Sequence, residues 1–468
     1  MKKLITGLIL IVTLVMIISL SGCITGRPPE FPIANPYAVS DGSGGAFVAY
    51  QVNKGNETNS YVQRLGEQGK TLWGKKGIDL EPGSGSPSLN NEGDFAALFS
   101  DGQGNVTVVY SKQHAVWVLK LDADGNEVQA ARRISGSDLP PMPVYFQAIG
   151  DNAGGVITAW AAGENSLGLQ KIDADSKEVW STEVKVPDRD RFDIACDDSG
   201  NTFIIWKDNP SYSEGNIYVQ QVNASGQAAW PDEGLRLTNT DNPGLVRSKL
   251  DQMIISDGES GVVVIWVQGV LSEDGRKIIG HDLYAQHISS EGEVLWDENG
   301  VFIAQVAHEP SIVGDASGEM GIFWGDLQNI YEQRLDAAGD FMWSEAGIKI
   351  AQAGEYSNVI HYYAESDGKG GFVIVWNYAE EDKKFLHVQR VDADGNKLWG
   401  DNGIKVSSVS PYWGGYSTPA RISPDGSGGF FVTWAAGEHI KDKTSSYIQR
   451  ISGDGELLWG EEGFRLDS

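Results

Sequence analysis

The sequence predicts an all-β fold, specifically an eight-bladed β-propeller built from four-stranded antiparallel blades. Three observations support this prediction: one unit recurs eight times, each unit holds four strand-length apolar runs, and Gly-rich turns separate the runs. Successive units begin 46 to 60 residues apart. An open solenoid is the rival architecture, but solenoids typically have shorter repeats and atypical capping units at both ends, and neither feature is present.

The best-preserved unit covers residues 367–406, DGKGGFVIVWNYAEEDKKFLHVQRVDADGNKLWGDNGIKV. After its first turn, a β-branched and aromatic run leads to Trp376. A second run, 386–391, ends at an Asp-Gly turn, and a third run covers 404–406. Another short apolar run precedes each unit. Runs of this length bounded by Gly, Asp and Asn predict four antiparallel strands per unit.

Two aromatic positions repeat along the units. One lies nine residues after the leading aspartate of each unit: Asp41/Tyr50, Asp101/Tyr110, Asp151/Trp160, Asp197/Trp206, Asp257/Trp266, Asp315/Trp324, Asp367/Trp376 and Asp425/Trp434. The other is a tryptophan four residues after a turn glycine: Trp73, Trp180, Trp230, Trp296, Trp343, Trp399 and Trp459. Ser176 replaces the glycine before Trp180, and the second unit has Gln129 in place of the tryptophan. Because 13 of the 15 tryptophans occupy these positions, we expect them to be structural, with the second set docking adjacent blades.

The third strand of the units carries a repeated glutamine: Gln63, Gln170, Gln220, Gln286, Gln333, Gln389 and Gln449. We expect these glutamines to hydrogen-bond to the backbone between blades. An arginine follows the glutamine in four units: Arg64, Arg334, Arg390 and Arg450. Because these arginines occupy the same position of the repeat, we expect them to be structural and not to form the catalytic arginine cluster of a sialidase-like propeller.

The N-terminus predicts export. Lys2 and Lys3 precede an apolar run, and small residues then lead to Cys23, as in a secretion signal. This ending resembles a bacterial lipobox, which implies a lipoprotein signal peptide at 1–22, lipidation of Cys23, a tether at 23–35 and a propeller domain at 36–468. An uncleaved membrane anchor with an incidental cysteine is the alternative. Both predict an extracytoplasmic protein, attached to the membrane only through its N-terminus.

Charge and cysteine content narrow the function classes. A net charge of −28 disfavours nucleic acid and anionic membrane surfaces as partners, because both require a basic face. Apart from Cys23, Cys196 is the only cysteine, so the mature chain cannot form an intrachain disulfide if Cys23 is lipidated. Cys196 ends a strand-like run, which predicts a small buried core residue.

The segments 121–125, 335–343 and 391–399 carry the LDADG, LDAAG…W and VDADG…W patterns. These resemble the PQQ-like repeats of quinoprotein-type eight-bladed propellers, in which Gly and Trp four residues apart dock adjacent blades. That family contains quinone-dependent dehydrogenases and a non-catalytic lipoprotein of outer-membrane assembly. The pattern is also similar to propeller repeats of bacterial surface proteins. The Asp-to-Gly spacing is one residue shorter than in the family, and the Thr before Gly is absent.

Catalytic machinery is not apparent in the sequence. The resemblance implies a quinone stacked on a vicinal disulfide, which this chain cannot form, so we expect no cofactor. The histidines lack metal-binding spacing, and the Asp-Gly turns are more typical of tight turns than of calcium sites, so we expect no metal. Paired carboxylates are too numerous to identify a catalytic acid and base, and we name no catalytic residue.

The loops provide the remaining clue. Both tight turns of a unit join strands one to two and three to four, so they should lie on one face, and the longer, variable connections on the other. Candidate ligand-binding aromatics there are Tyr412, Trp413, Tyr416, His361 and Tyr362; the alternative is that they only cover the edge of the ring. We therefore expect a monomeric, non-catalytic binding or scaffolding module for protein or glycan. A carbohydrate-active enzyme and an envelope-assembly subunit are the alternatives.

Overall fold

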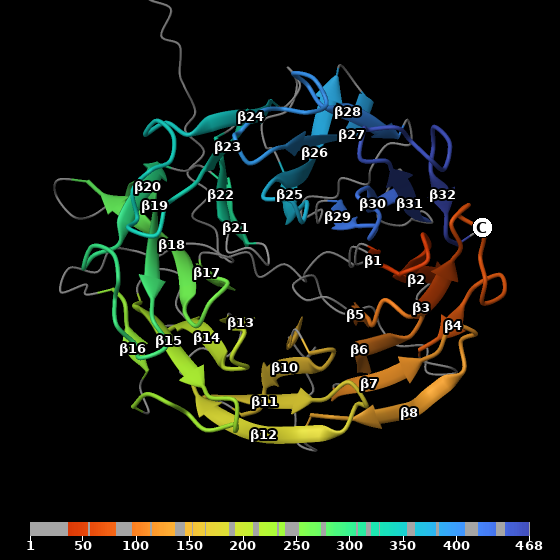
Figure 1. Ribbon diagram of the computed structural model, residues 1–468, viewed down its shortest axis with the longest axis horizontal. Coiled ribbons are helices and arrows are strands. Elements are labelled where there is room, and N and C mark those ends of the chain that lie inside the picture. The colour runs from red at the N-terminus through yellow and green to blue at the C-terminus, as the bar shows by residue number, and fades with distance from the viewer. Residues whose placement is uncertain are drawn as a thin grey trace, which may run out of the picture.

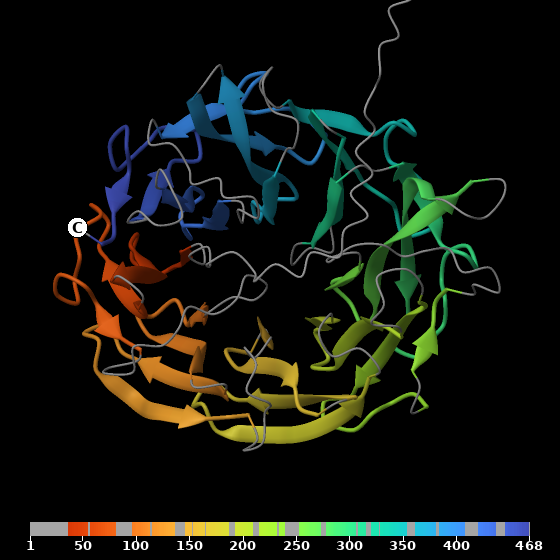
Figure 2. The same cartoon turned by 180° about the vertical axis from the view of Figure 1, so that it is seen from behind.

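The computed structural model describes residues 36–54, 57–80, 96–112, 115–135, 146–151, 153–163, 165–186, 192–208, 215–231, 234–238, 252–272, 278–305, 308–314, 320–326, 328–352, 361–380, 383–407, 420–436 and 445–467. Eight four-stranded antiparallel sheets are arranged around a central axis (Figures 1 and 2). The predicted eight-bladed β-propeller is therefore confirmed. The described part of the chain contains no helical segment that could span a bilayer.

Each blade is formed by four consecutive strands that pair in sequence order, so blade 1 is β1–β4 and blade 8 is β29–β32. The first strand of each blade lies nearest the axis (Figure 1). These innermost strands are β1 (Tyr37–Ser40), β5 (Ala96–Ser100), β9 (Phe146–Gly150), β13 (Phe192–Cys196), β17 (Gln252–Ser256), β21 (His308–Gly314), β25 (Tyr362–Ser366) and β29 (Arg421–Pro424). The second strands are β2 (Ala46–Lys54), β6 (Val106–Lys112), β10 (Val156–Ala161), β14 (Thr202–Lys207), β18 (Val262–Leu271), β22 (Met320–Gly325), β26 (Phe372–Glu380) and β30 (Phe430–Ala436).

The two outer strands of each blade complete the sheet. The third strands are β3 (Glu57–Leu65), β7 (Ala115–Leu121), β11 (Ser166–Ile172), β15 (Ile217–Val222), β19 (Ile278–Ile288), β23 (Asn329–Gln333), β27 (Lys383–Val391) and β31 (Ser445–Ile451). The fourth strands are β4 (Ile78–Asp79), β8 (Glu127–Arg133), β12 (Glu178–Lys185), β16 (Leu235–Arg236), β20 (Val301–Gln305), β24 (Ile348–Gln352), β28 (Ile404–Ser407) and β32 (Phe464–Arg465). The second strands are the most deeply buried, because each packs against both neighbouring blades.

The repeated tryptophans lie between blades. In seven junctions, the indole of one blade packs on the turn glycine of the following blade: Trp73 on Gly125, Trp180 on Gly226, Trp230 on Gly292, Trp296 on Gly339, Trp343 on Gly395, Trp399 on Gly455 and Trp459 on Gly69. Several of the rings also donate their indole N–H to the neighbouring backbone, as Trp73 does to the carbonyl oxygen of Ala123 (3.0 Å). Trp73, Trp180, Trp296 and Trp399 are buried, and Trp230, Trp343 and Trp459 are half-buried.

The junction between blades 2 and 3 differs from the other seven. Blade 2 has Gln129 instead of the tryptophan, and the facing turn of blade 3 has Ser176 instead of the glycine. Ser176 is the only non-glycine residue with a positive φ (59°) in the described part of the chain. Arg132 of β8 donates to the carbonyl oxygen of Ser176 (3.0 Å) and thus bridges this junction. The two partners of the docking contact are absent together, which supports their pairwise role.

The repeated glutamines correct one expectation. Each was expected to bond between blades, but Gln389 donates to the carbonyl oxygen of Gly400 and accepts the backbone N–H of Trp399 (3.0 Å), both within its own blade. Gln63, Gln220, Gln286 and Gln449 hold their own tryptophan loops in the same way. The glutamine therefore shapes the loop, and the tryptophan carried by that loop reaches the next blade.

The ring closes without exchange of a strand between the first and last blades, since the described strands of each sheet are consecutive. Side chains join blade 8 to blade 1 instead. The Ser40 hydroxyl donates to the carbonyl oxygen of Asp425 (2.7 Å), and Trp459 donates to the carbonyl oxygen of Glu67 (2.9 Å). A buried cluster that includes Ala38 and Phe431 fills the same junction.

Candidate functional site

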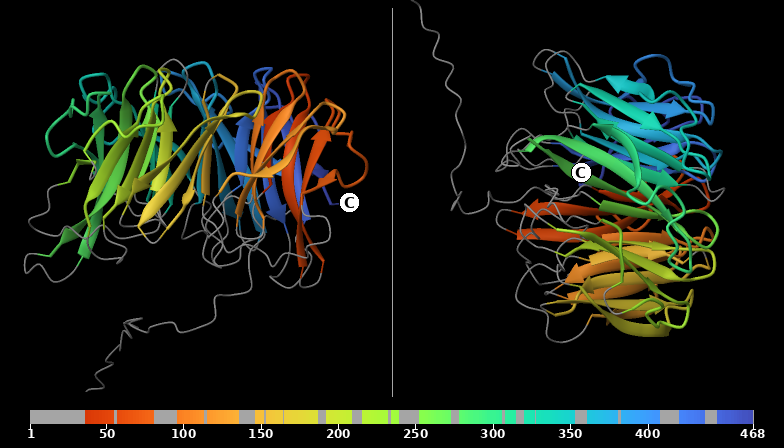
Figure 3. Two further views of the ribbon diagram at one scale, coloured as in Figure 1. Left: turned by 90° about the horizontal axis from the view of Figure 1, so that it is seen from below. Right: turned by 90° about the vertical axis from the view of Figure 1, so that its left-hand side faces the viewer.

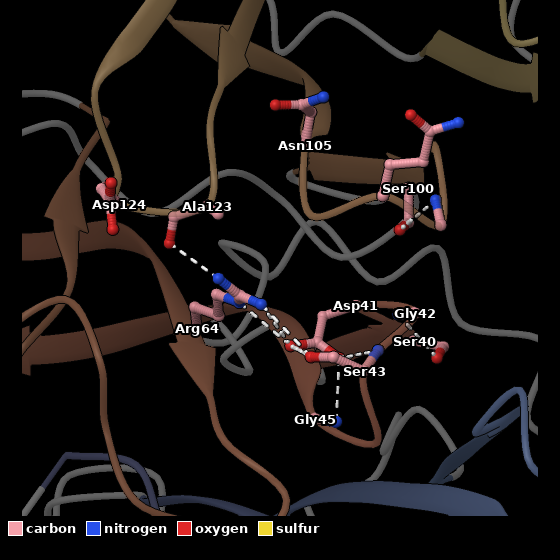
Figure 4. A network of polar contacts seen from close by, with 12 residues as sticks. Ser40, Asp41, Gly42, Ser43, Gly45, Arg64, Ser100, Asn105, Ala123 and Asp124 are labelled. Carbon is pink, nitrogen blue, oxygen red and sulfur yellow. Dashed lines mark hydrogen bonds and ion pairs between the residues drawn. The ribbon is translucent and has the colours of Figure 1, made fainter.

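In the seven blades whose leading aspartate the structure describes, this aspartate holds the first turn. One carboxylate oxygen of Asp41 accepts the backbone N–H groups of Ser43 and Gly45, both at 2.8 Å, and Arg64 pairs with the other oxygen at 2.9 Å (Figure 4). Burial acts to raise the pKa of Asp41, but the hydrogen bonds from Ser43, Arg64 and Gly45 outweigh it, so the pKa lies below its usual range. The carboxylate is therefore committed to the turn.

This ion pair recurs around the ring. The matching pairs are Arg64–Asp41, Lys171–Asp151, Arg390–Asp367 and Arg450–Asp425, and His287 makes a hydrogen bond with Asp257 at the same repeat position. Arg64 also donates to the carbonyl oxygen of Ala123 in the next blade (2.8 Å), as Figure 4 shows. The repeated arginines thus act structurally, as expected: each pairs with an acid of its own blade, and Arg64, Arg334 and Arg390 also donate to a carbonyl oxygen of the following blade.

The second turn of each blade is also self-contained. One oxygen of Asp392 accepts the N–H groups of Asp394 (3.0 Å) and Asn396 (2.8 Å), and the other accepts the side-chain amide of Asn396 (3.0 Å). Asp122 is bonded in the same way. Within the described residues, no group of three or more acidic, histidine or cysteine side chains could hold a metal ion.

The two faces of the ring differ in their loops. The stretch between the first and second strands is five residues long in every blade and starts at the leading aspartate. The connections between blades range from residues 306–307, between β20 and β21, to residues 80–95, between β4 and β5. Because the strands are antiparallel, these variable connections start on the face opposite the turns; the turns project upward in the left panel of Figure 3. We call the two sides the turn face and the variable face.

Two positions on each innermost strand, four and two residues before the leading aspartate, are mostly part-exposed at the inner edge. The residue between them is buried in seven blades and half-buried in blade 3 (Ala148). The first set is Tyr37, Ala97, Gln147, Asp193, Met253, Ser311, Tyr363 and Arg421. The second set is Val39, Phe99, Ile149, Ala195, Ile255, Val313, Glu365 and Ser423. Glu365 and Arg421 are the two charged residues on neighbouring blades in these sets.

Tyr37, Tyr363, Glu365 and Arg421 form what we call the inner cluster. The guanidinium carbon of Arg421 lies 5.6 Å from the ring centroid of Tyr37 in blade 1 and 5.5 Å from that of Tyr363 in blade 7. Both distances are within the range of cation–π attraction. Arg421, from blade 8, is thus held by aromatic rings of both neighbouring blades.

Glu365 is the acid of the inner cluster. Burial raises the pKa of Glu365 to about 7, against the opposing effects of the Ser366 N–H (3.1 Å), the Arg421 charge and a hydrogen bond with Tyr363. Near neutral pH, therefore, Glu365 is only partly ionised. The arrangement provides a positioned cation beside aromatic surface, which suits recognition of an anionic group.

The predicted ligand-binding aromatics have different outcomes. His361 is part-exposed immediately before β25, and its carbonyl oxygen accepts the N–H of Asn377 (3.1 Å). Tyr362 is not the exposed aromatic that was expected: it is only 5% exposed and packs in the cluster between blades 6 and 7. Tyr412, Trp413 and Tyr416 lie outside the described residues, as does Cys23.

Sequence reasoning missed the inner cluster, although it selected the connections that lead into β25 and β29. Strand alternation explains the error at Tyr362, because the next residue, Tyr363, is the one that points to the inner edge. The missed signal was available in the repeats. Aligned by their leading aspartates, the units have apolar or uncharged residues at most inner-edge positions. Asp193, Glu365 and Arg421 are the charged exceptions, and only Glu365 and Arg421 lie on neighbouring blades.

No family model and no curated protein matches the chain, so the PQQ-like resemblance stays a prediction. Among solved structures, the chain is similar to the lectin BP39L from Burkholderia pseudomallei, with 13% identity and a TM-score of 0.49 over 80% of this chain and 99% of that one. It is also similar to the polysaccharide lyase Uly1, with 8% identity and a TM-score of 0.44 over 91% and 100% of the two chains. The propeller domain of the Trilobed protease from Pyrococcus furiosus has 10% identity and a TM-score of 0.38, over 80% and 98%. Structural similarity at these levels of identity and TM-score does not show that two proteins share a ligand or an activity.

Proposed function

We propose that this protein is a non-catalytic, extracytoplasmic binding or scaffolding module that engages a protein or glycan through its variable face. The single observation that supports this most is the difference between the two faces. On the turn face, the repeated polar side chains are bonded to their own turns or to the next blade. On the variable face, connections of very different length are carried by a rigid ring, which is the usual arrangement of a binding surface.

The proposal includes lipid anchoring at Cys23. The support is the charged, apolar and small-residue order of residues 1–23, which is typical of a lipoprotein signal. A tether at 23–35 would then connect the lipid to the first strand at Tyr37. In this arrangement the membrane is contacted through the lipid alone, and the propeller binds its partner as a monomer.

The experiment is a pull-down of cell-envelope extract and purified glycans with the full protein. Two matched triple variants are compared with wild type: alanine at Tyr412, Trp413 and Tyr416 on the variable side, and alanine at Asp124, Asp394 and Asp454 on the turn face. We expect only the first variant to lose its partner, while both keep the wild-type melting temperature. If only the second variant loses its partner, the partner binds the turn face, and the proposal is refuted.

A carbohydrate-active enzyme is the second candidate, and one observation favours it. The raised pKa of Glu365, about 7, is in the range that suits a general acid at neutral pH. The test is product formation from any glycan that the protein retains, with a Glu365→Gln variant as the control. Turnover that disappears in this variant would replace the binding proposal with the enzymatic one.

A further inference from the structure

We propose that the inner cluster is a carboxylate-binding site, in which the guanidinium of Arg421, held between Tyr37 and Tyr363, pairs with a carboxylate of the ligand. This inference rests on the proposed binding function and names the ligand chemistry at one point of the variable face. The carboxylate could belong to an acidic saccharide or to a peptide, and the test separates these two sources.

The position of the cluster places it within reach of a ligand on the variable face. Tyr37 and Arg421 are the first residues of β1 and β29, and Tyr363 is the second residue of β25. These are the ends at which the connections between blades enter the innermost strands. The connections that enter β25 and β29 are the ones that carry the predicted ligand-binding aromatics.

The geometry of Arg421 favours recognition over simple solvation. Two tyrosines from flanking blades restrict the guanidinium, so less rotamer entropy is lost when it pairs with a ligand. A guanidinium donates in its own plane and matches the two oxygens of a carboxylate. One arginine beside one acid suits a singly charged carboxylate better than a phosphate dianion, particularly in a protein with a net charge of −28.

Glu365 makes the site sensitive to pH. A charged Glu365 near Arg421 repels an incoming carboxylate, and protonation of Glu365 removes that repulsion. The other inner-edge residues on the strands packed against β25 are uncharged: Ser311 and Val313 on β21, and Ser423 on β29. His361 precedes β25, and its protonation would also favour an anion, so a Glu365 variant is needed to decide between the two groups.

The test is calorimetric titration of the full-length protein in detergent at pH 5.5 and 8, with two pairs of probes. One pair is trigalacturonic acid and the corresponding neutral galactose trisaccharide. The other is an N-acetylated tripeptide with a free C-terminal carboxylate and its amide. We expect one charged probe to bind, more tightly at pH 5.5, and its neutral counterpart not to bind. The charged probe that binds identifies the source of the carboxylate.

Three variants complete the test. Arg421→Gln should weaken binding by at least about tenfold, the effect of losing a charged hydrogen-bonded partner. Glu365→Gln should retain binding and lose its pH dependence. Asp193→Asn removes a charge at an inner-edge position of blade 4 and should change neither the binding affinity nor its pH dependence. If Arg421→Gln destabilises the fold, the loss of pH dependence in Glu365→Gln decides.

Two results would overturn the inference. One is that neither charged probe binds the wild-type protein. The other is that Arg421→Gln and Glu365→Gln both behave like Asp193→Asn. In either case the proposed function would survive if the variant at Tyr412, Trp413 and Tyr416 still lost its partner, so the two failures are distinguishable.

Discussion

The docking tryptophans give a prediction whose size can be derived from the structure. Trp399 is 8% exposed, its ring packs edge-on against Phe430 with centroids 6.0 Å apart, and its indole N–H donates to the carbonyl oxygen of Gly453 (3.3 Å). Trp399→Ala leaves a cavity between blades 7 and 8, which should cost about 3–5 kcal/mol of unfolding free energy. The measurement is urea denaturation followed by tryptophan fluorescence and circular dichroism.

The glycine that faces this ring allows a matched control. A Cβ added at Gly455 would lie 3.1 Å from the indole, whereas at Gly400 it would meet nothing within 4 Å. Both glycines have positive φ, 89° and 75°. Gly400→Ala should therefore lower the unfolding free energy by only about 1–2 kcal/mol, the strain of a residue with a Cβ in a left-handed backbone conformation. Gly455→Ala should lower it by more.

A double variant then isolates the contact. In a protein that already carries Trp399→Ala, the cost of Gly455→Ala should fall to that of Gly400→Ala, because the ring that opposes the new methyl is gone. The docking role is refuted if Trp399→Ala unfolds at the wild-type urea concentration. It is also refuted if the two glycine variants cost the same in the wild-type background.

Three further predictions follow from single residues. Cys23→Ser should release the protein from membranes or leave an unprocessed precursor; membrane fractionation decides, and unchanged attachment with a cleaved N-terminus would remove the lipoprotein proposal. Glu332 is fully buried, and its Oε1 lies 2.9 Å from Nε of Arg334. Burial nevertheless raises the pKa of Glu332 from 4.5 to about 7. Its contribution to stability is therefore complete below pH 4.5 and is lost as pH rises through 7. Glu332→Gln should flatten the fall of the urea midpoint between pH 5 and 8, and an unchanged slope would contradict this. Ser176→Gly should raise stability by about 1 kcal/mol by relieving its positive φ, and a lower melting temperature would show that the serine is preferred there.

The fold was predictable because the repeats provide internal controls. The spacing between Asp367 and Trp376 recurs in every unit: the aspartate directly follows the first strand, and the aromatic residue lies within the second strand. The observed strands β27 and β28 extend the expected runs by only a few residues. Cys196, expected to be a small core residue, is buried at the end of β13, where burial raises its thiol pKa to about 11.

The site was less predictable, because it depends on which side of a strand a residue occupies. Tyr362 and Tyr363 are adjacent and chemically alike, yet one is buried between blades and the other lies at the inner edge. The contact of Arg421 with Tyr37 joins residues from opposite ends of the chain, and only ring closure brings them together. The expectation that the glutamines bond between blades was wrong for a similar reason, because a repeat pattern does not show whether a hydrogen bond stays within a blade.

Hydrogen exchange of the full protein, with and without a partner recovered from the envelope, tests the central claim most directly. The claim is that one face of the ring recognises the partner and the other serves only the fold. We expect protection from exchange in the segments 353–361 and 408–420 and in the first residues of β25 and β29, which lie at the variable face. We expect no change at the turns that begin at Asp41, Asp367 and Asp425. Protection confined to those turns would contradict the account.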